Sequence, residues 1–368
     1  MLSEPSTLNR LAAGRSNRNV STLFISVIVP VRNEARFIER TLAQLVGQDY
    51  DQERFEIIVV DGESTDGTAE LVAKFAQRYP NLRLFSNPKR FSSAARNIAI
   101  RQARGDVVLL VDGHCELEGD RYLIELAEAL ERSGAECIGR PQPQDIVGAG
   151  PLQRAIAAAR SSRMGHHPDS HIYSSAESFV SAESVAVAYR RGVFENVGYF
   201  DESFDACEDV EFNHRVDRAG LRCFFTPRIT AHYAPRDTLR GLFCQLFRYG
   251  RGRVRLWRKH PETLTIKTLP PALFVLGCLF GPGLACLSWW LAAAYLGVLA
   301  LYLVMVLGGS LAGAVARRDA AILPWLPLVF MAIHWGAGTG FLWEIIVGRR
   351  RKDPPCIGKQ EIRKGRAR

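Results

Sequence analysis

The sequence has few cysteines and no closely spaced pair of them. Its 368 residues include eight cysteines without a C-x-x-C pair, so we expect neither a disulfide framework nor a zinc site, and a reducing compartment fits. No G-x-G-x-x-G follows the first apolar run, which argues against a dinucleotide-dependent oxidoreductase. No Ser-His-Asp or Cys-His set is visible. The first 22 residues lack a long apolar run, which excludes a secretory signal and favours a flexible leader.

Most of the chain lacks a net positive charge, although the whole chain carries +9. Residues 1–235 hold 27 basic and 32 acidic residues, whereas 236–267 and 349–368 each hold nine basic and two acidic ones. A nucleic-acid-binding protein carries its positive charge on the folded domain, so we expect no nucleic-acid partner. Basic segments that border a neutral apolar block are typical of a membrane protein.

No charged residue occurs between 269 and 312. These 44 residues are about twice the ~20 needed to cross a bilayer, and we predict a helical hairpin near 271–290 and 293–312. The alternative is a buried core hairpin of a soluble protein. A third apolar stretch at 320–347, interrupted by prolines, could span the membrane, re-enter it or lie in its interface.

The basic borders predict the orientation of this membrane part. Cytoplasmic flanks are rich in Lys and Arg, and such flanks occur at 236–268, at Arg317-Arg318 and in the tail at 348–368. They favour a catalytic domain at 23–235 that faces the cytosol, in a multi-pass protein of the inner (cytoplasmic) membrane. They also favour a third segment that re-enters, because a single full crossing would put the basic tail outside.

Short runs rich in Val, Ile and Leu alternate with helical stretches over the first 110 residues. The runs at 23–31, 55–60, 82–85 and 106–111 are typical of buried parallel strands. Helices are predicted between and after them at 34–47, 67–79 and 92–104. This alternation predicts an open α/β sheet, in which ligands bind at the carboxyl ends of the strands.

Five motifs occur in one order along this domain: SVIVPVRNE, VVDGESTDGT, SSAARNIAI, VVLLVDGH and GYFDESFDACEDVEFNHRVDRAG. Together they resemble a family 2 glycosyltransferase of the GT-A fold, over residues 23–260. The apolar tail, the DGH sequence and the stretch QLFRYGRGR resemble the succinoglycan-type exopolysaccharide glucosyltransferases. The resemblance implies a Rossmann-like mixed sheet with flanking helices, followed by transmembrane helices.

The resemblance implies a nucleotide-sugar donor bound at the strand ends. Carboxylates there accept hydrogen bonds from uracil N3–H and ribose hydroxyls. For Asp66 the alternative is a helix-capping role in a strand-to-helix turn, and Arg96 either contacts the donor or organises the acids around it. The predicted donor-binding residues are Pro30, Arg32, Asn33, Glu34, Asp61, Ser64, Asp66, Arg96, Asn97, Asp112 and Gly113.

Asp112-Gly113-His114 stands where the family has its metal-binding DxD motif. In the family, two acids coordinate a divalent metal that bridges the donor diphosphate. Oxygen ligands suit Mg²⁺ and Mn²⁺, and Mn²⁺ also accepts imidazole. We therefore predict Asp112 and His114 as ligands of Mg²⁺ or Mn²⁺, and the departure from two acids leaves the role of His114 open.

Glu208-Asp209 lies at the predicted start of a helix, where two acids could simply favour the helix dipole. Transfer with inversion needs one general base on the face opposite the leaving diphosphate. We predict that Asp209 is this base and that Glu208 assists beside it. The nearby Asp201, Glu202 and Asp205 are interpreted as turn residues.

Gln245, Arg248 and Tyr249 resemble the QxxRW motif of processive family members, with Tyr in place of Trp. Gln245 and Arg248 share a helix face, which is predicted to contact the acceptor sugar and diphosphate. The basic run from Arg251 to Lys259 also fits an interfacial segment that holds anionic lipid. A polyprenyl-diphosphate-linked acceptor would favour the same positive charge.

The leading hypothesis is thus an inverting, metal-dependent transfer of a hexose, such as glucose, from a UDP-sugar to a lipid-linked saccharide in exopolysaccharide synthesis. Two alternatives stay open: a processive polysaccharide synthase, and an inactive membrane scaffold with the same fold. His166, His167 and His171 could form a metal cluster but fit a flexible acceptor loop better, and His214 and His232 are interpreted as ordinary polar residues.

Overall fold

The computed structural model describes residues 22–166 and 171–348. The predicted leader, except for its last residue, therefore lies outside the described residues. The same holds for most of the basic tail and for His167.

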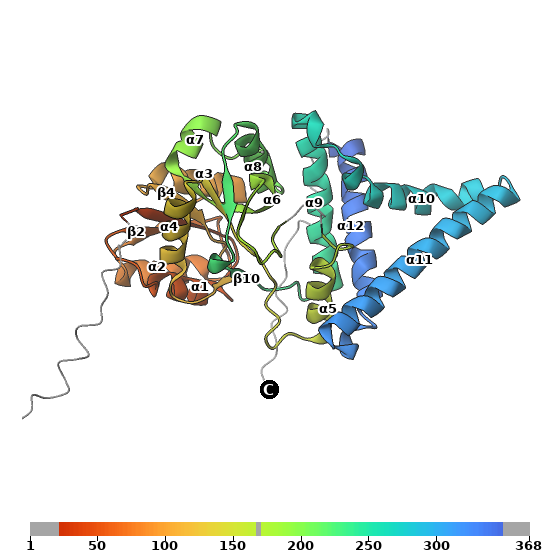
Figure 1. Cartoon of the computed structure of the whole chain (residues 1–368), viewed down its shortest axis with the longest axis horizontal. Helices are drawn as coiled ribbons and strands as arrows, with labels where there is room; N and C mark the ends of the chain where they lie inside the picture. The colour runs from red at the N-terminus through yellow and green to blue at the C-terminus, as the bar shows by residue number, and fades with distance from the viewer. Residues whose placement is uncertain (1–21, 167–170, 349–368) are drawn as a thin grey trace, which may run out of the picture.

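An eight-stranded mixed sheet forms the centre of the amino-terminal part (Figure 1). Its order is β3-β2-β1-β4-β8-β6-β9-β7. The first four strands in this order are parallel, and β8 runs antiparallel to both of its neighbours. The strands are β1 (Ile25–Val31), β2 (Phe55–Asp61), β3 (Leu82–Ser86), β4 (Val107–Leu110), β6 (Cys137–Gly139), β7 (Ser178–Val180), β8 (Ala186–Arg190) and β9 (Cys223–Phe225). The predicted α/β sheet is confirmed.

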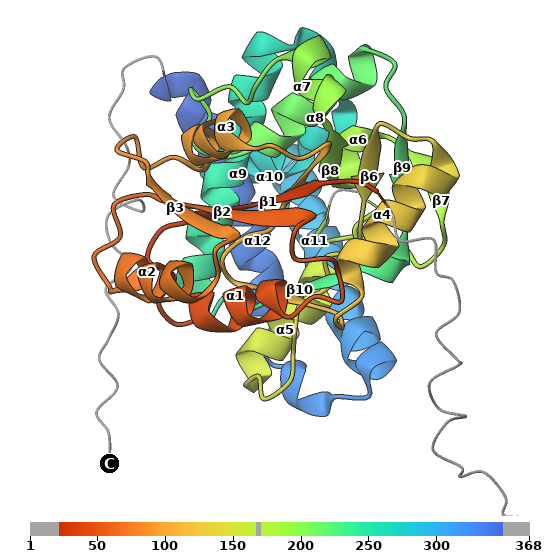
Figure 2. The same ribbon diagram turned by 90° about the vertical axis from the view of Figure 1, so that its left-hand side faces the viewer.

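Helices cover both faces of this sheet (Figure 2). Alternate residues of β1 point to opposite faces, so Val27 packs in one core and Ile28 in the other. The first face carries α1 (Ile38–Val46), α2 (Thr68–Arg78) and α4 (Tyr122–Ser133), and the second carries α3 (Ser92–Gln102), α6 (Ala182–Val185), α7 (Arg191–Val197) and α8 (Glu208–Arg218).

A separate two-stranded sheet joins the segment after β4 to a distant part of the chain. Strand β5 (Cys115–Leu117) pairs antiparallel with β10 (Ala231–Tyr233), and Tyr233 lies opposite Cys115. The short turn η2 (Pro227–Ile229) precedes β10. This pairing brings Tyr233 beside the Asp112-Gly113-His114 segment.

The carboxyl-terminal part consists of long helices (Figure 1). They are α9 (Leu239–Lys259), α10 (Pro270–Ala285), α11 (Trp289–Arg317) and α12 (Leu326–Ile346), with short turns η3 (Pro261–Thr263), η4 (Ile266–Thr268) and η5 (Ala320–Ile322). The turn of the predicted hairpin therefore lies at 286–288, and Ser288 caps α11. By length and composition α11 and α12 could each cross a membrane, whereas α10 is shorter.

Helix α12 lies along α9, which faces the catalytic domain, while α10 and α11 project away (Figure 1). Glycines allow the close approach, as in small-xxx-small helix pairs. A Cβ atom at Gly340 would lie 2.0 Å from the Phe247 carbonyl oxygen, and one at Gly250 would lie 2.1 Å from that of Ala337. The third apolar segment thus packs against α9 from about Gly336 to Glu344.

The basic run of α9 forms ion pairs within the chain. Arg251 Nε and Arg255 Nε each lie 2.9 Å from a carboxylate oxygen of Glu344, which is buried on α12. Asp205 lies in the bend before α8, as expected for a turn residue, and it also pairs with the same two arginines. Arg251 and Arg255 are thus paired with acids of the chain itself.

The boundary between the two parts differs from the one predicted at residue 235. Helix α5 (Pro151–Arg160) leaves the α/β domain and packs with α9, α11 and α12. Its alanines, such as Ala155 and Ala159, are fully buried there. The sequence of α5 has no long apolar run, so its place in the helical part was not predictable from composition.

Gly340→Ala should destabilise the helical part, because the added Cβ meets the backbone of α9. We expect an overpacking cost of roughly 1–3 kcal/mol, measured as a lower midpoint of thermal unfolding in detergent. Gly308→Ala on α11 is the matched control, since nothing lies within 4 Å of a Cβ at that position. Equal midpoints for the two variants would contradict this packing.

Candidate active site

Asp112 is held by two partners just beyond the end of β4. The Tyr233 hydroxyl donates to Asp112 Oδ2 at 3.0 Å, and Arg96 Nη2 lies 3.8 Å from Asp112 Oδ1. Burial alone would raise the pKa of Asp112, but the charge of Arg96, with smaller contributions from His114 and Tyr233, holds it below its usual value. Asp112 is therefore a carboxylate with a fixed orientation.

Arg140 stands behind this pair and was missed by the sequence reasoning. It is fully buried at the end of β6, and its Nη2 donates to the Tyr233 oxygen at 3.3 Å. Tyr233 is 121 residues from Asp112 in the chain. No local motif signals either residue, because both reach Asp112 only through sheet pairing. Arg140 and Tyr233 thus form a chain of hydrogen bonds that orients Asp112.

Arg96 joins Asp112 to the two acids that begin α8. Its Nη1 lies 3.2 Å from Glu208 Oε1, and its guanidinium lies over the Phe200 ring at 5.3 Å. Glu208 is buried, and burial raises its pKa, with Arg96 opposing and Asp209 adding to the shift. Arg96 is thus paired with these acids, and its contact with the donor stays a prediction.

His114 and Glu34 form a pair at the same edge of the sheet. His114 Nδ1 lies 3.0 Å from Glu34 Oε1. Burial opposes the charged imidazole, but the hydrogen bond and charge of Glu34 outweigh it and raise the pKa of His114. A carboxylate on Nδ1 leaves Nε2 as the second ring nitrogen, as in carboxylate–histidine–metal arrangements.

The donor set of Asp112 and His114 fits a divalent ion. Asp112 supplies carboxylate oxygens and His114 an imidazole nitrogen, and each has an outer partner, Tyr233 or Glu34. Ions of this class use few protein ligands when substrate phosphates complete the shell. Mn²⁺ accepts this mixed set more readily than Mg²⁺ does.

Asp61 ends β2 with one carboxylate oxygen in use and one available. Oδ2 accepts from the Ser64 backbone N–H at 3.0 Å. Oδ1 is buried and has no hydrogen-bond partner among the described residues. A buried acceptor without a donor is costly, so Asp61 fits the predicted contact with a donor N–H or hydroxyl.

Three predicted donor residues lock two loops together. The Asn33 backbone N–H donates to Ser64 Oγ at 2.9 Å, and Asn33 Oδ1 accepts from the Thr65 backbone N–H at 2.9 Å. Asp66 accepts from the backbone N–H groups of Ala35 and Thr68. Of the two interpretations of Asp66, the structure favours a loop and capping role.

The remaining predicted donor residues differ in position. Pro30 lies within β1 opposite Val60, and Arg32 is exposed just beyond it. A Cβ at Gly113 would lie 2.8 Å from Val31 Cγ1, so this glycine permits close packing.

Asn97 is buried, and its side-chain amide forms hydrogen bonds with Phe200 and Glu202. Asn97 therefore positions the 200–202 loop, and direct donor contact is not supported for it.

The loop that precedes α8 and Asp209 contacts the part of α9 that carries the predicted acceptor motif. Asp209 is exposed, unlike Glu208. Arg248 Nη2 donates to the Asp205 carbonyl, and Gln245 Nε2 donates to the Tyr249 hydroxyl at 3.2 Å. The exposed Tyr249 lies one helical turn beyond Gln245 on the same side of α9. The loop that leads into Asp209 thus contacts the part of α9 that carries the predicted acceptor motif, through Arg248 and through Cys207 Sγ, which lies 3.8 Å from the Tyr249 carbonyl oxygen.

Comparisons with known proteins identify the family of this chain. Residues 26–198 match the family model described as glycosyl transferase family 2. The succinoglycan biosynthesis protein ExoA of Rhizobium meliloti (strain 1021) is 32% identical over 330 residues, which are 88% of this chain and 96% of that protein.

Two further comparisons extend the range of relatives. Dolichyl N-acetyl-alpha-D-glucosaminyl phosphate 3-beta-D-2,3-diacetamido-2,3-dideoxy-beta-D-glucuronosyltransferase of Methanococcus voltae is 28% identical over 246 residues, covering 64% of this chain and 74% of that protein. The structure of the mannosyltransferase PcManGT from Pyrobaculum calidifontis, in complex with GDP-Man and Mn²⁺, has a TM-score of 0.51 at 22% identity and covers 85% of this chain and 87% of that one. The latter likeness shows the GT-A fold. The chain belongs to glycosyltransferase family 2 and is a hexosyltransferase of the GT-A fold.

Proposed function

We propose that the protein transfers a hexose from a UDP-sugar to a lipid-linked saccharide with inversion, in the synthesis of an exopolysaccharide. The observation that carries this proposal is that the two acids at the start of α8 differ in burial. Glu208 is buried against Arg96, whereas Asp209 is exposed at the start of α8, just after the loop that Arg248 of the acceptor motif contacts at Asp205. An exposed carboxylate next to the acceptor is suited to take a proton from its hydroxyl.

The donor side follows from the strand-end residues. Asp61, with its available buried oxygen, would bind the nucleoside, and Asp112 with His114 would hold a divalent ion. When bound, that ion neutralises charge on the donor diphosphate. Arg96 keeps Asp112 ionised and Glu208 in place. The neighbour with GDP-Man and Mn²⁺ supports a nucleotide-sugar donor and a divalent ion.

The acceptor side is open to a lipid-linked diphosphate. A cavity of about 750 Å³ lies between the 202–205 loop, α9 and α12. It is lined by four cationic side chains, Arg251, Arg255, Arg258 and Lys259, against three acidic ones, Glu202, Asp205 and Glu344. The Methanococcus voltae relative, named for transfer to a dolichyl phosphate-linked sugar, supports a lipid-linked acceptor.

The helical part is proposed to anchor the enzyme in the inner membrane with its catalytic domain in the cytosol. Large apolar side chains of α11, such as Trp290, Leu296 and Val304, are exposed, and burying such a surface in lipid is favourable. Helix α12 lies on α9, which suits an interfacial or re-entrant segment better than an independent crossing.

The proposed function is tested by transfer of labelled sugar from a panel of nucleotide sugars to lipid-linked acceptors in membrane extract. We expect transfer from UDP-hexoses, UDP-glucose above all, loss of transfer with a chelator, and recovery with Mn²⁺ or Mg²⁺. Transfer only from a GDP- or dTDP-sugar would overturn the donor assignment. Full activity in the chelator would overturn the metal assignment.

Product length separates this proposal from the processive synthase. The Gln245-Arg248-Tyr249 motif favours a synthase, but a synthase needs enough membrane helices to enclose a polymer. In the described part of the chain, α10 and α11 form one projecting hairpin, and α12 packs against α9. We therefore expect addition of one sugar, and a ladder of longer products would favour the synthase.

A further inference from the structure

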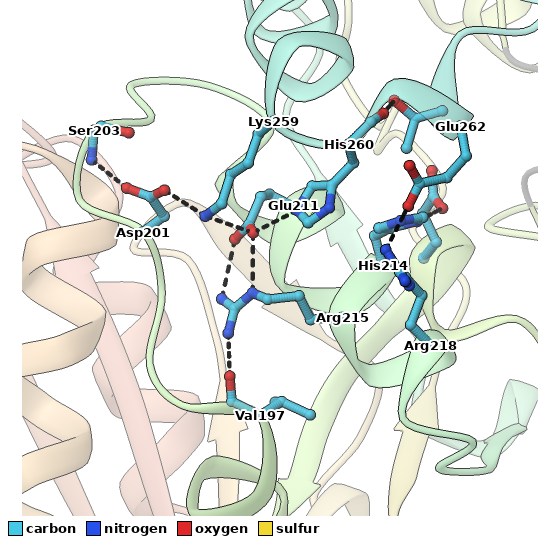
Figure 3. A network of polar contacts seen from close by, with 12 residues as sticks. Val197, Asp201, Ser203, Glu211, His214, Arg215, Arg218, Lys259, His260 and Glu262 are labelled. Atoms are coloured by element: carbon cyan, nitrogen blue, oxygen red, sulfur yellow. Dashed lines mark hydrogen bonds and ion pairs between the residues drawn. The ribbon is translucent and has the colours of Figure 1, made fainter.

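Two histidines lie side by side where α8 of the catalytic domain contacts the end of α9 (Figure 3). His214 lies on α8, and His260 ends α9; their ring centroids are 4.7 Å apart. Glu262 of η3 lies next to them, with Oε1 3.1 Å from His214 Nε2. One potential ligand atom from each of the three residues lies within 4.8 Å of the other two.

Each histidine also has a carboxylate outside this group of three residues. His214 Nδ1 lies 3.2 Å from Glu183 Oε2, and His260 Nε2 lies 3.1 Å from Glu211 Oε1. With protons on these outer nitrogens, His214 Nε2 and His260 Nδ1 would be the atoms that bind an ion, and His214 Nε2 would give up its hydrogen bond to Glu262. Outer carboxylates that hold a histidine in one tautomer are a regular feature of metal sites.

We propose that His214, His260 and Glu262 bind a divalent transition ion of the zinc class. Two imidazole nitrogens and one carboxylate oxygen form a donor set that suits Zn²⁺ and is unsuited to Mg²⁺. Three protein ligands leave a fourth position for water. This site is separate from Asp112 and His114, and it differs from the expectation that the chain holds no zinc.

Binding requires a modest contraction of the cluster. Ligand atoms around tetrahedral Zn²⁺ are about 3.3 Å apart, which is closer than the 4.8 Å limit within which these three lie. The Glu262 side chain is 46% exposed and can move, but Arg218 Nη1 lies 2.7 Å from its Oε1. The ion would therefore displace Arg218, which is itself largely exposed and can be solvated.

The bound ion would join the two parts of the enzyme. Helix α8 begins with Glu208 and Asp209, and α9 carries the acceptor motif. The contact between His214 and the end of α9 already links these helices through hydrogen bonds to Glu262 and Glu211. A metal–ligand link at this point would fasten the base-bearing helix to the helix that contacts the acceptor.

The test is a titration of Zn²⁺ into the full-length protein in detergent, after chelator treatment and in an excess of Mg²⁺. We expect one equivalent bound, with a rise in the midpoint of thermal unfolding. Co²⁺ in the same protein should give the visible absorption of a tetrahedral site. His214→Ala and His260→Ala should each lose this equivalent.

Matched variants keep the result interpretable. Glu183→Gln alters the outer partner of His214, which also pairs with Arg253 at 3.7 Å, and leaves the three ligands in place. It should weaken Zn²⁺ binding about ten- to hundredfold, so the proposal stays testable if His214→Ala fails to fold. His114→Ala and His232→Ala should keep the equivalent, because both residues lie outside the cluster. No bound Zn²⁺ in the parent protein, or unchanged binding in folded His214→Ala or His260→Ala, would overturn the proposal and leave a hydrogen-bond network only.

Discussion

Asp209→Asn should lower kcat for sugar transfer by roughly 10²- to 10⁴-fold, the range that one general base contributes. Asparagine has nearly the shape of aspartate but cannot take the proton of the acceptor hydroxyl. Asp209 is exposed, and its Oδ1 accepts from the neighbouring Val210 N–H at 2.8 Å, so the substitution should leave the fold intact. The KM for the donor should change little, because donor contacts are assigned to Asp61 and Asp112.

The measurement compares initial rates of labelled transfer for the parent and the variant over a range of donor concentrations. Glu195→Gln provides the control, since Glu195 is an exposed acid on α7, away from α9. It loses one negative charge like the variant and should keep full activity. A kcat for Asp209→Asn within tenfold of the parent would remove Asp209 from the base role.

Local features of the sequence predicted the positions of the strand-end residues well. Strand runs, their polar ends and the order of the motifs placed Asp61, Asp112 and His114 at one edge of the sheet, where the structure has them. These residues follow directly from buried strands whose carboxyl ends meet. Boundaries were less accurate, as α1 begins at Ile38 rather than at residue 34 because the preceding loop is tied to Asp66.

Features that depend on distant pairing could not be predicted in the same way. Tyr233 reaches Asp112 because β10 pairs with β5, and Arg140 reaches Tyr233 from β6. Glu344 neutralises the arginines of α9 because glycines let α12 approach. Each of these contacts joins segments that lie far apart in the chain. The sequence around one segment contains nothing that predicts which other segment it contacts.

Arg96→Met should strongly destabilise the catalytic domain and reduce its activity. Arg96 is 8% exposed, and it is the counter-charge for the buried Glu208 and a neighbour of Asp112. Breaking a buried ion pair from one side costs about 3–5 kcal/mol, because the other charge is left uncompensated. For a domain of this size that corresponds to a fall in the unfolding midpoint on the order of 10 °C.

A double variant distinguishes lost charge balance from lost packing. Arg96→Met with Glu208→Gln removes both charges, so it should recover much of the unfolding midpoint lost in Arg96→Met, since replacing both partners is far less costly than removing one. Thermal unfolding of the parent, both single variants and the double variant forms a double-mutant cycle. Transfer activity should stay low in the double variant, because Asp112 still lacks the charge that keeps it ionised and oriented. Additive losses would instead mean that Arg96 acts through its packing on Phe200 and that its pairing with Glu208 contributes little.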